Sequence, residues 1–306
     1  MSQHPSNIRQ LGLALLVTAV ILAAEITGGI LSNSLALMSD AGHVLTDGLA
    51  LLLSLVAGLM AQKPADFRAT YGYQRIGILA ALINGASLVV IALLIFWEAY
   101  RRLQNPMEIQ TGVMIRVATL GLAGNLLMAW LLHKGHHDLN VKSAWLHVLG
   151  DTLSSVAVVV AGIVISFTGF WLIDPLLSVF VGLVIVVGGI RVVKDALLVF
   201  LEMSPLGLHA EELAKGLMQF SGVWNVHDVH LWSIGYEIPA FSAHISTSEM
   251  TLSQADALRK KLENYLKGAG ITHTTLQMEC SCSSDSFYCR LNSNAPNHQC
   301  CDGHNH

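Results

Sequence analysis

The sequence SDAGHVLTD at residues 39–47 lies inside an apolar stretch that runs from residue 35 to residue 61. A similar but shorter segment, HVLGD at residues 147–151, lies inside a second apolar stretch. In both, a histidine and an aspartate are four positions apart, so on a helix they share one face, one turn from each other. Two such faces turned toward each other would present two imidazoles and two carboxylates, from His43, Asp47, His147 and Asp151.

Ionisable side chains inside an apolar helix need a partner, water or a metal to offset the cost of leaving water. On membrane-insertion scales, an aspartate at the centre of an apolar helix costs about 2.5–3.5 kcal/mol. A single His–Asp pair could simply hold two helices together. Two pairs at the same spacing favour a functional site, because ionisable groups in a membrane helix are by default functional.

Composition places most of the chain in lipid. Of its 306 residues, 53% are hydrophobic and 12% are charged, whereas soluble domains carry about 25% charged residues. The net charge of −4 gives no indication of a nucleic-acid partner. Several apolar stretches approach or exceed the about 20 residues that a membrane helix needs. They cover residues 11–31, 35–61, 76–100, 112–132, 143–168 (starting as early as residue 139) and 171–190.

The sequence therefore predicts a six-helix transmembrane domain over residues 1–203. The first stretch exceeds the about 7–15 residues of a signal peptide's apolar region, so we expect it to remain as a membrane helix. Six spans put both termini on one side, and the connecting segments there hold most of the basic residues. Since cytoplasmic loops carry that excess, we expect both termini in the cytoplasm and the protein in the cell (inner) membrane. The basic residues on that side are Arg9, Lys63, Arg68, Arg75, Lys134, Lys142, Arg191 and Lys194, and the Arg101–Arg102 pair is a weak counter-signal.

In this topology the stretches at 35–61 and 143–168 run in opposite directions across the membrane. The repeated His-x-x-x-Asp pair then indicates an inverted three-plus-three repeat, a transporter plan with its site where the repeats meet. Polar residues elsewhere in the spans are expected to bond between helices. These are Glu25, Asn84, Glu98 and Asn125.

Residues 204–280 have a different composition, with more charge and no long apolar run. Apolar residues at helical spacing predict helices, and alternating patterns between them predict strands. The predicted order is helix 208–220, strand 224–234, strand 236–247, helix 251–267 and strand 271–280. This order indicates a small α+β domain with helices over a three-stranded sheet. Residues 281–306 are rich in Asn, Ser, Cys and His and are expected to be a tail that is disordered without a ligand.

The ligand types at the two His–Asp pairs favour zinc, because two nitrogens and two oxygens suit a tetrahedral Zn²⁺. The absence of Cys and Met from the pairs disfavours Cu(I), and the histidines disfavour Mg²⁺ and Ca²⁺. Cobalt, nickel, iron(II) and cadmium stay open. Without metal, two aspartates would carry two negative charges in a medium of low dielectric, which protons would relieve. Metal and protons are therefore expected to compete for one site, which is the chemical basis of antiport.

Three further groups contain metal-binding residue types. His133, His136 and His137 lie in one loop, which either captures zinc or is an ordinary solvated loop. His230 and His244 fall on adjacent predicted strands, and Glu279 lies at the end of the third. Cys280, Cys282 and Cys289 belong to the tail, which is either a chelating arm or inert. In the cytoplasm these thiols would stay reduced and available to zinc.

Together, the residues resemble the cation diffusion facilitator family. The matching segments are SDAGHVLTD at 39–47, YGYQR at 71–75, ING at 83–85, LNV at 139–141 with HVLGD, and HDVHLW at 227–232. The resemblance implies a homodimer with a ferredoxin-like cytoplasmic domain and proton-coupled export of zinc. It implies that His43, Asp47, His147 and Asp151 carry the transported ion, with Asp40 supporting them from outside the ligand set. It also aligns His230, His244 and Glu279 with regulatory zinc ligands at the dimer interface.

Two other classes of membrane protein also bind zinc. A membrane zinc sensor would use the C-terminal domain and tail, but it has no need for ligands inside the membrane. An intramembrane metalloprotease needs a metal-bound water and a base, commonly in an H-E-x-x-H motif, which this sequence lacks. No phosphate-binding glycine motif is present, so nucleotide is not expected as a cofactor. Of the three classes, a transporter rather than an enzyme is the expectation.

Overall fold

The computed structural model describes residues 5–133, 139–236, 238–280 and 287–288. Side chains are described at these positions except 5–17, 51, 54, 128, 131–133 and 139–147. The chain divides into two compact units. The helical unit comprises residues 1–56 and 80–193, and the C-terminal unit comprises residues 57–79 and 194–306. Each unit is described here by itself.

Long helices form where the apolar stretches predict them. Their bounds are α1 Pro5–Ser32, α2 Leu35–Ala61, α3 Arg75–Gln104, α4 Thr111–His133, α5 Leu139–Thr168 and α6 Ile173–Phe200. The early start of α5 at Leu139 is confirmed. Both α3 and α6 continue past their apolar stretches into segments that contain basic residues.

Within the described residues, four helices are long and apolar enough to cross a membrane, namely α2, α3, α6 and the segment Val148–Thr168 of α5. The described apolar parts of the other two, Thr18–Ser32 and Thr111–Leu127, are shorter. A transmembrane span needs about 20 residues. The membrane character of the helical unit is therefore clear, although six complete spans are not established.

Close packing in the helical unit depends on small residues. A Cβ on Gly189 of α6 would lie 3.0 Å from the carbonyl oxygen of Gly85 on α3, so both positions need glycine for the backbones to approach. Small residues have this role in membrane helices, where lipid provides no hydrophobic drive for association. The predicted interhelical bond of Asn125 is confirmed, since its Nδ2 donates to Ser155 Oγ on α5 at 3.1 Å. Glu98, by contrast, pairs along its own helix with Arg101 and Arg102.

The start of α2 is held by a carboxylate that is distant in sequence. Asp174, fully buried at the start of α6, accepts hydrogen bonds from Ser34 Oγ at 2.6 Å and from the amides of Leu35 and Ala36 at 2.6 and 3.2 Å. The first amides of a helix have no partner within it. Ser34 Oγ accepts from the amide of Leu37 at 3.1 Å as a local cap, and Asp174 accepts from the two amides before it. The guanidinium of Arg102 lies 3.9 Å from the same carboxylate.

The C-terminal unit has the predicted order of elements. It contains α7 Ala210–Leu217, β1 Val223–Gly235, β2 Ile238–Thr247, α8 Leu252–Gly268 and β3 His273–Cys280. The sheet order is β1-β2-β3, with β1 and β2 antiparallel and β2 and β3 parallel. Thr251 caps α8, and Gln254 completes a reciprocal capping box. Helix α7 is shorter than predicted, since residues 208–209 before it and residues 218–220 after it are not helical.

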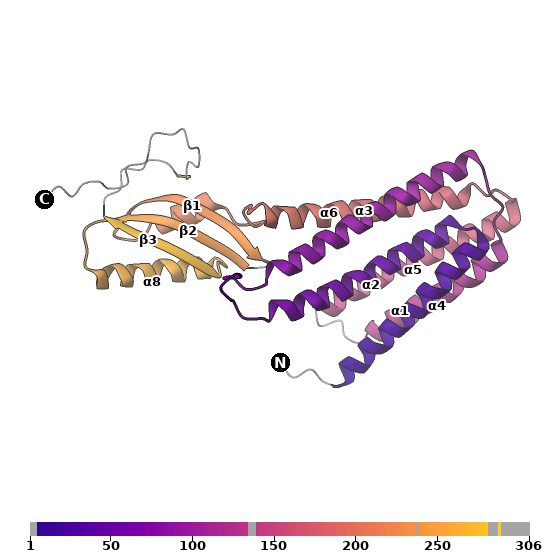
Figure 1. Ribbon diagram of the computed structural model, residues 1–306, viewed down its shortest axis with the longest axis horizontal. Helices are drawn as coiled ribbons and strands as arrows, with labels where there is room; N and C mark the ends of the chain where they lie inside the picture. Colours follow the sequence, from indigo (N-terminus) through magenta and orange to yellow (C-terminus); the bar gives the residue numbers. More distant parts are fainter. Residues whose placement is uncertain (1–4, 134–138, 237, 281–286, 289–306) are drawn as a thin grey trace. The chain divides into compact units, whose positions relative to one another are not determined.

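One face of this sheet is apolar and the other is polar. Phe241, Ala243 and Ile245 of β2 point into a core shared with α7 and α8, and α8 lies along the sheet in Figure 1. Because strand side chains alternate, the intervening residues Ser242 and His244 point to the other face. The helices thus leave one face of the sheet free to carry polar side chains.

Replacing Asp174 with alanine is expected to destabilise the purified protein by about 2–3 kcal/mol, because three buried donors lose a charged acceptor at once. The measurement is the thermal unfolding midpoint in detergent. Glu108→Ala, which removes an exposed carboxyl from the same unit, is the matched control and should leave the midpoint unchanged. Equal midpoints for the two variants would contradict the capping role.

Candidate metal centres

The first candidate centre joins α2 and α5. Nε2 of His43 lies 3.7 Å from Oδ2 of Asp47 and 3.7 Å from Oδ1 of Asp151. One ligand atom from each of the three residues lies within 4.8 Å of the others. All three side chains are partly buried. Helix geometry brings His43 and Asp47 onto one face, and helix packing brings Asp151 to them from a position far along the chain.

The spacing of these atoms suits a small divalent cation. Zn–N and Zn–O distances of about 2.0–2.2 Å put the ligand atoms of a tetrahedral site about 3.3–3.5 Å apart. The two separations from His43, 3.7 Å each, are slightly larger, and all three ligand atoms lie within 4.8 Å of one another, so side-chain movement of about 1 Å or less would close the set on an ion. Two carboxylates would offset the charge of a divalent cation.

The fourth predicted ligand, His147, is on α5 one turn before Asp151. Its side chain lies outside the described residues. Asp40, one turn before His43, is buried and accepts a hydrogen bond from Ser154 Oγ at 2.7 Å. That bond directs it to a hydroxyl on α5.

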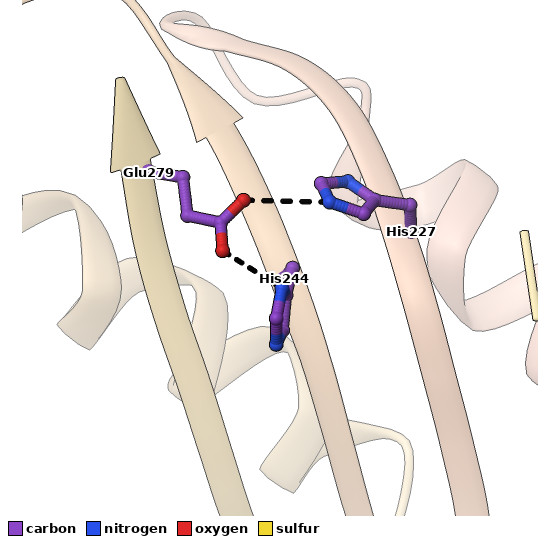
Figure 2. Close-up of side chains that lie close together, drawn as sticks. All are labelled: His227, His244 and Glu279. Carbon is purple, nitrogen blue, oxygen red and sulfur yellow. Dashed lines mark ion pairs between the residues drawn. The ribbon is translucent and has the colours of Figure 1, made fainter. Parts of the chain in front are cut away.

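The second candidate centre lies on the polar face of the C-terminal sheet. Figure 2 shows the carboxylate of Glu279 on β3 directed toward His244 of β2 and His227 of β1. Its Oε1 lies 2.7 Å from Nδ1 of His244, and its Oε2 lies 3.4 Å from Nε2 of His227. One ligand atom from each residue lies within 4.8 Å of the others. His227 is 3% exposed, and its Nδ1 accepts or donates no hydrogen bond among the described residues.

A β-bulge places His227 in this cluster. In the ladder between β1 and β2, His227 is opposite His244 and His230 is opposite Ser242, so three steps along β1 match two along β2. The extra residue is accommodated at Asp228, whose φ of 50° lies in the left-handed region. Without the bulge, alternation would place His227 and His230 on opposite faces. With it, both share the face that carries His244.

His230, predicted as a ligand with His244 and Glu279, is therefore next to the cluster but not within it. Its Nε2 lies 3.4 Å from Oδ1 of Asp228, and Oδ2 of Asp228 lies 3.4 Å from Nε2 of His244. Asp228 thus connects His230 to the cluster through a carboxylate. The sequence contained one signal for the bulge, since Asp tolerates the left-handed region better than most residues, but this alone does not predict the bulge.

The other predicted candidates are only partly described. His133 ends α4 with its side chain outside the described residues, and His136, His137, Cys282 and Cys289 are outside them altogether. Cys280 ends β3 as an exposed free thiol.

In the loop between α2 and α3, hydrogen bonds from Tyr73 Oη and from the amides of Ala69 and Arg68 hold the pKa of the Asp66 carboxyl below its usual range.

Comparison with known proteins finds the same two parts. Residues 11–201 match the family model described as "Cation efflux transmembrane domain", and residues 205–281 match "Cation efflux protein, cytoplasmic domain". The chain is 41% identical over 278 residues to "Zinc transporter ZitB" of Escherichia coli (strain K12), covering 90% of this chain and 88% of the relative.

Two further relatives have broader printed names. "Cadmium, cobalt and zinc/H(+)-K(+) antiporter" of Bacillus subtilis (strain 168) is 38% identical, covering 90% of this chain and 89% of the relative. "Metal cation efflux system protein CzcD" of Cupriavidus metallidurans is 37% identical, covering 90% of this chain and 88% of the relative. The similarity therefore covers the helices and the C-terminal sheet alike.

Replacing Asp228 with valine is expected to loosen the pairing of β1 with β2, because a β-branched residue in the left-handed region costs about 1–2 kcal/mol. Asp228→Asn is the matched control, since Asn tolerates this backbone while it also lacks the charge. Hydrogen exchange of the β1 and β2 amides in the full chain is the measurement. Faster exchange is expected for the valine variant alone, and equal exchange in both variants would show that the backbone at residue 228 does not maintain the bulge.

Proposed function

The chain belongs to the cation efflux family, and we propose that it is a secondary antiporter that exports divalent metal cations, zinc above all. The sequence-based resemblance to cation diffusion facilitators is confirmed by the two family matches. The protein is an integral membrane transporter and not an enzyme. The runner-up class, a sensor that binds zinc without moving it, is disfavoured by candidate ligands inside the apolar helices.

The transported ion is bound by His43, Asp47, Asp151 and His147 in this proposal. The observation that carries it is the convergence of His43, Asp47 and Asp151 within 4.8 Å, from two helices of apolar composition. His147 joins the set because it is one helical turn from Asp151. Three or four protein ligands of mixed nitrogen and oxygen type favour zinc over Mg²⁺ or Cu(I).

Protons are the counter-ion in this proposal. When the metal leaves, ligand atoms of Asp47 and Asp151 remain within 4.8 Å of each other with His43 beside both, and protons bound at the site would relieve the repulsion between the carboxylates. A site that exchanges metal for protons on opposite sides of the membrane couples their flows in opposite directions. The relative in Bacillus subtilis is named as an antiporter that exchanges metals with H⁺ and K⁺, which supports antiport here.

The architecture proposed is that of a homodimer in the cell (inner) membrane. Each protomer has six membrane helices over residues 1–203, with both termini cytoplasmic because the basic residues gather on that side. Residues 204–280 form a ferredoxin-like domain; residues 281–306 are the Cys/His-rich segment, which lies outside the described residues except at 287–288. The helix-strand-strand-helix-strand order supports the ferredoxin-like assignment, although its sheet has three strands among the described residues.

The C-terminal cluster serves as a regulatory zinc site in this proposal. His227, His244 and Glu279 supply two nitrogens and one carboxylate, which leaves room for a fourth ligand from water, Asp228 or a second protomer. His230 remains a candidate through its contact with Asp228. The loop histidines and tail cysteines would deliver or buffer zinc.

Purified protein in proteoliposomes is expected to carry zinc, and Asp151→Asn is expected to abolish that flux because the ion loses a charged ligand. Asp195→Asn, which changes an exposed carboxylate on α6, is the matched control and should transport normally.

Zinc flux should also respond to an imposed pH gradient. Flux indifferent to the gradient would rule out proton coupling, and zinc binding without any flux would favour the sensor. Competition by cadmium, cobalt, nickel and iron(II) would rank selectivity.

Zinc bound per protomer at the C-terminal site is expected to fall in His227→Ala and His244→Ala, but not in His230→Ala, because only the first two lie in the cluster. Equilibrium dialysis of the full chain in an Asp151→Asn background isolates this site from the transport site. His209→Ala is the control for loss of an exposed histidine in the same unit. Zinc loss in His230→Ala equal to that in His244→Ala, with none in His227→Ala, would restore His230 as the ligand.

A further inference from the structure

Glu25 of α1 is an unusual carboxyl in the helical unit. It is 1% exposed, and its Oε2 accepts no hydrogen bond from the described residues. The side chain lies against α4 at Gly121, where an added Cβ would be 2.7 Å from Glu25 Oε1. The glycine therefore makes the room that the carboxyl occupies.

The other buried carboxyl groups of this unit have partners. Asp174 accepts three hydrogen bonds and Asp40 accepts one from Ser154. A carboxylate without such partners in a medium of low dielectric is costly, and a bound proton removes most of that cost. Glu25 thus has the environment of a group that takes up and releases a proton.

The surroundings of Glu25 are polar without supplying a positive charge. Its carboxyl interacts electrostatically with Asp40 of α2 and Asp151 of α5. On α4, Gly121 lies against Glu25. The carboxyls of Asp40 and Asp151 act on Glu25, and His43 in turn acts on Asp40. The proton on Glu25 must therefore respond to how much charge these groups carry.

Asp40 and Ser154, which are hydrogen-bonded to each other, lie one helical turn from the candidate transport site. Asp40 precedes His43 by three positions on α2, and Ser154 follows Asp151 by three on α5, an axial step of about 4.5 Å. Because α2 and α5 run in opposite directions in the proposed topology, both steps lead the same way, toward the start of α2. With cytoplasmic termini, that direction is outward, the side from which counter-ions would enter.

We propose that Glu25 is a proton-binding residue of the antiport cycle, separate from the metal ligands. Its carboxylate binds a proton from the outer side, forming one O–H bond, and that bond breaks when the proton is released on the cytoplasmic side after the site has turned inward. The metal moves the other way on its own ligands. This inference rests on the proposed zinc–proton antiport.

The test compares two fluxes in proteoliposomes for wild type and Glu25→Gln, an isosteric change that cannot ionise. Zinc–zinc exchange moves no net protons, so Glu25→Gln is expected to retain it. Zinc transport driven by a pH gradient needs the proton, so the same variant is expected to lose it, together with the pH dependence of the rate. Asp195→Asn, which changes an exposed carboxylate on α6, is the control and should keep the wild-type pH dependence.

Every outcome of this experiment either supports or overturns the proposal. Glu25→Gln with wild-type response to the pH gradient overturns the proposal, and so does a folded variant that loses exchange as well, since Glu25 would then serve the metal site or the packing. If Glu25→Gln does not fold, Glu25→Asp replaces it and should show a displaced pH profile with intact exchange; an unchanged profile overturns the proposal. Wild-type flux that ignores the pH gradient would instead refute the proposed function, which keeps the two failures distinguishable.

Discussion

The need to compensate ionisable groups inside apolar helices governs the helical unit. Among the described residues, the cost of burying these groups is offset in different ways. Asp174 accepts hydrogen bonds from two buried amides and one hydroxyl at the start of α2, and its charge is shared among these three donors. His43, Asp47 and Asp151 face one another, so that an ion could satisfy all three. A structural carboxylate and a candidate metal ligand thus differ in whether their partners are fixed within the protein.

Part of this arrangement could be predicted from the sequence. The long helices follow from apolar length, and α8 with its Thr251 cap follows from apolar spacing and a capping residue. The pairing of His43 with Asp47 is local, since four residues on a helix make one turn. That Asp151 meets them was expected only because the His-x-x-x-Asp spacing recurs, and it is not implied by either helix alone.

Other features could not be predicted because they depend on the register of distant segments. The contact of Asp174 with the amides at the start of α2 requires residues 139 and 138 positions apart to meet, so no local pattern predicts it. Strict alternation along β1 predicts His230 beside His244, but the extra residue at Asp228 adds His227 to that face. A shift of one residue changes which side chains face which side of a strand, so the ligand set cannot be read from alternation alone.

The two candidate centres differ in ways that suit different tasks. The centre on α2 and α5 has two carboxylates for one described imidazole, on partly buried side chains. Excess negative charge attracts a divalent cation and also invites protons to displace it, which a transporter needs for release. The sheet centre has two imidazoles for one carboxylate, with His227 almost fully buried, and each of its ligands is fixed on a separate strand. An ion there would gain stronger nitrogen ligation and a rigid frame, which favours retention over turnover. Around the sheet centre, Glu279 pairs with His227 and His244, and Asp228 pairs with His230 and His244, so three imidazoles face two carboxylates. In the proposed antiport, proton coupling therefore belongs to the membrane helices, where two carboxylates share one described imidazole in a medium of low dielectric.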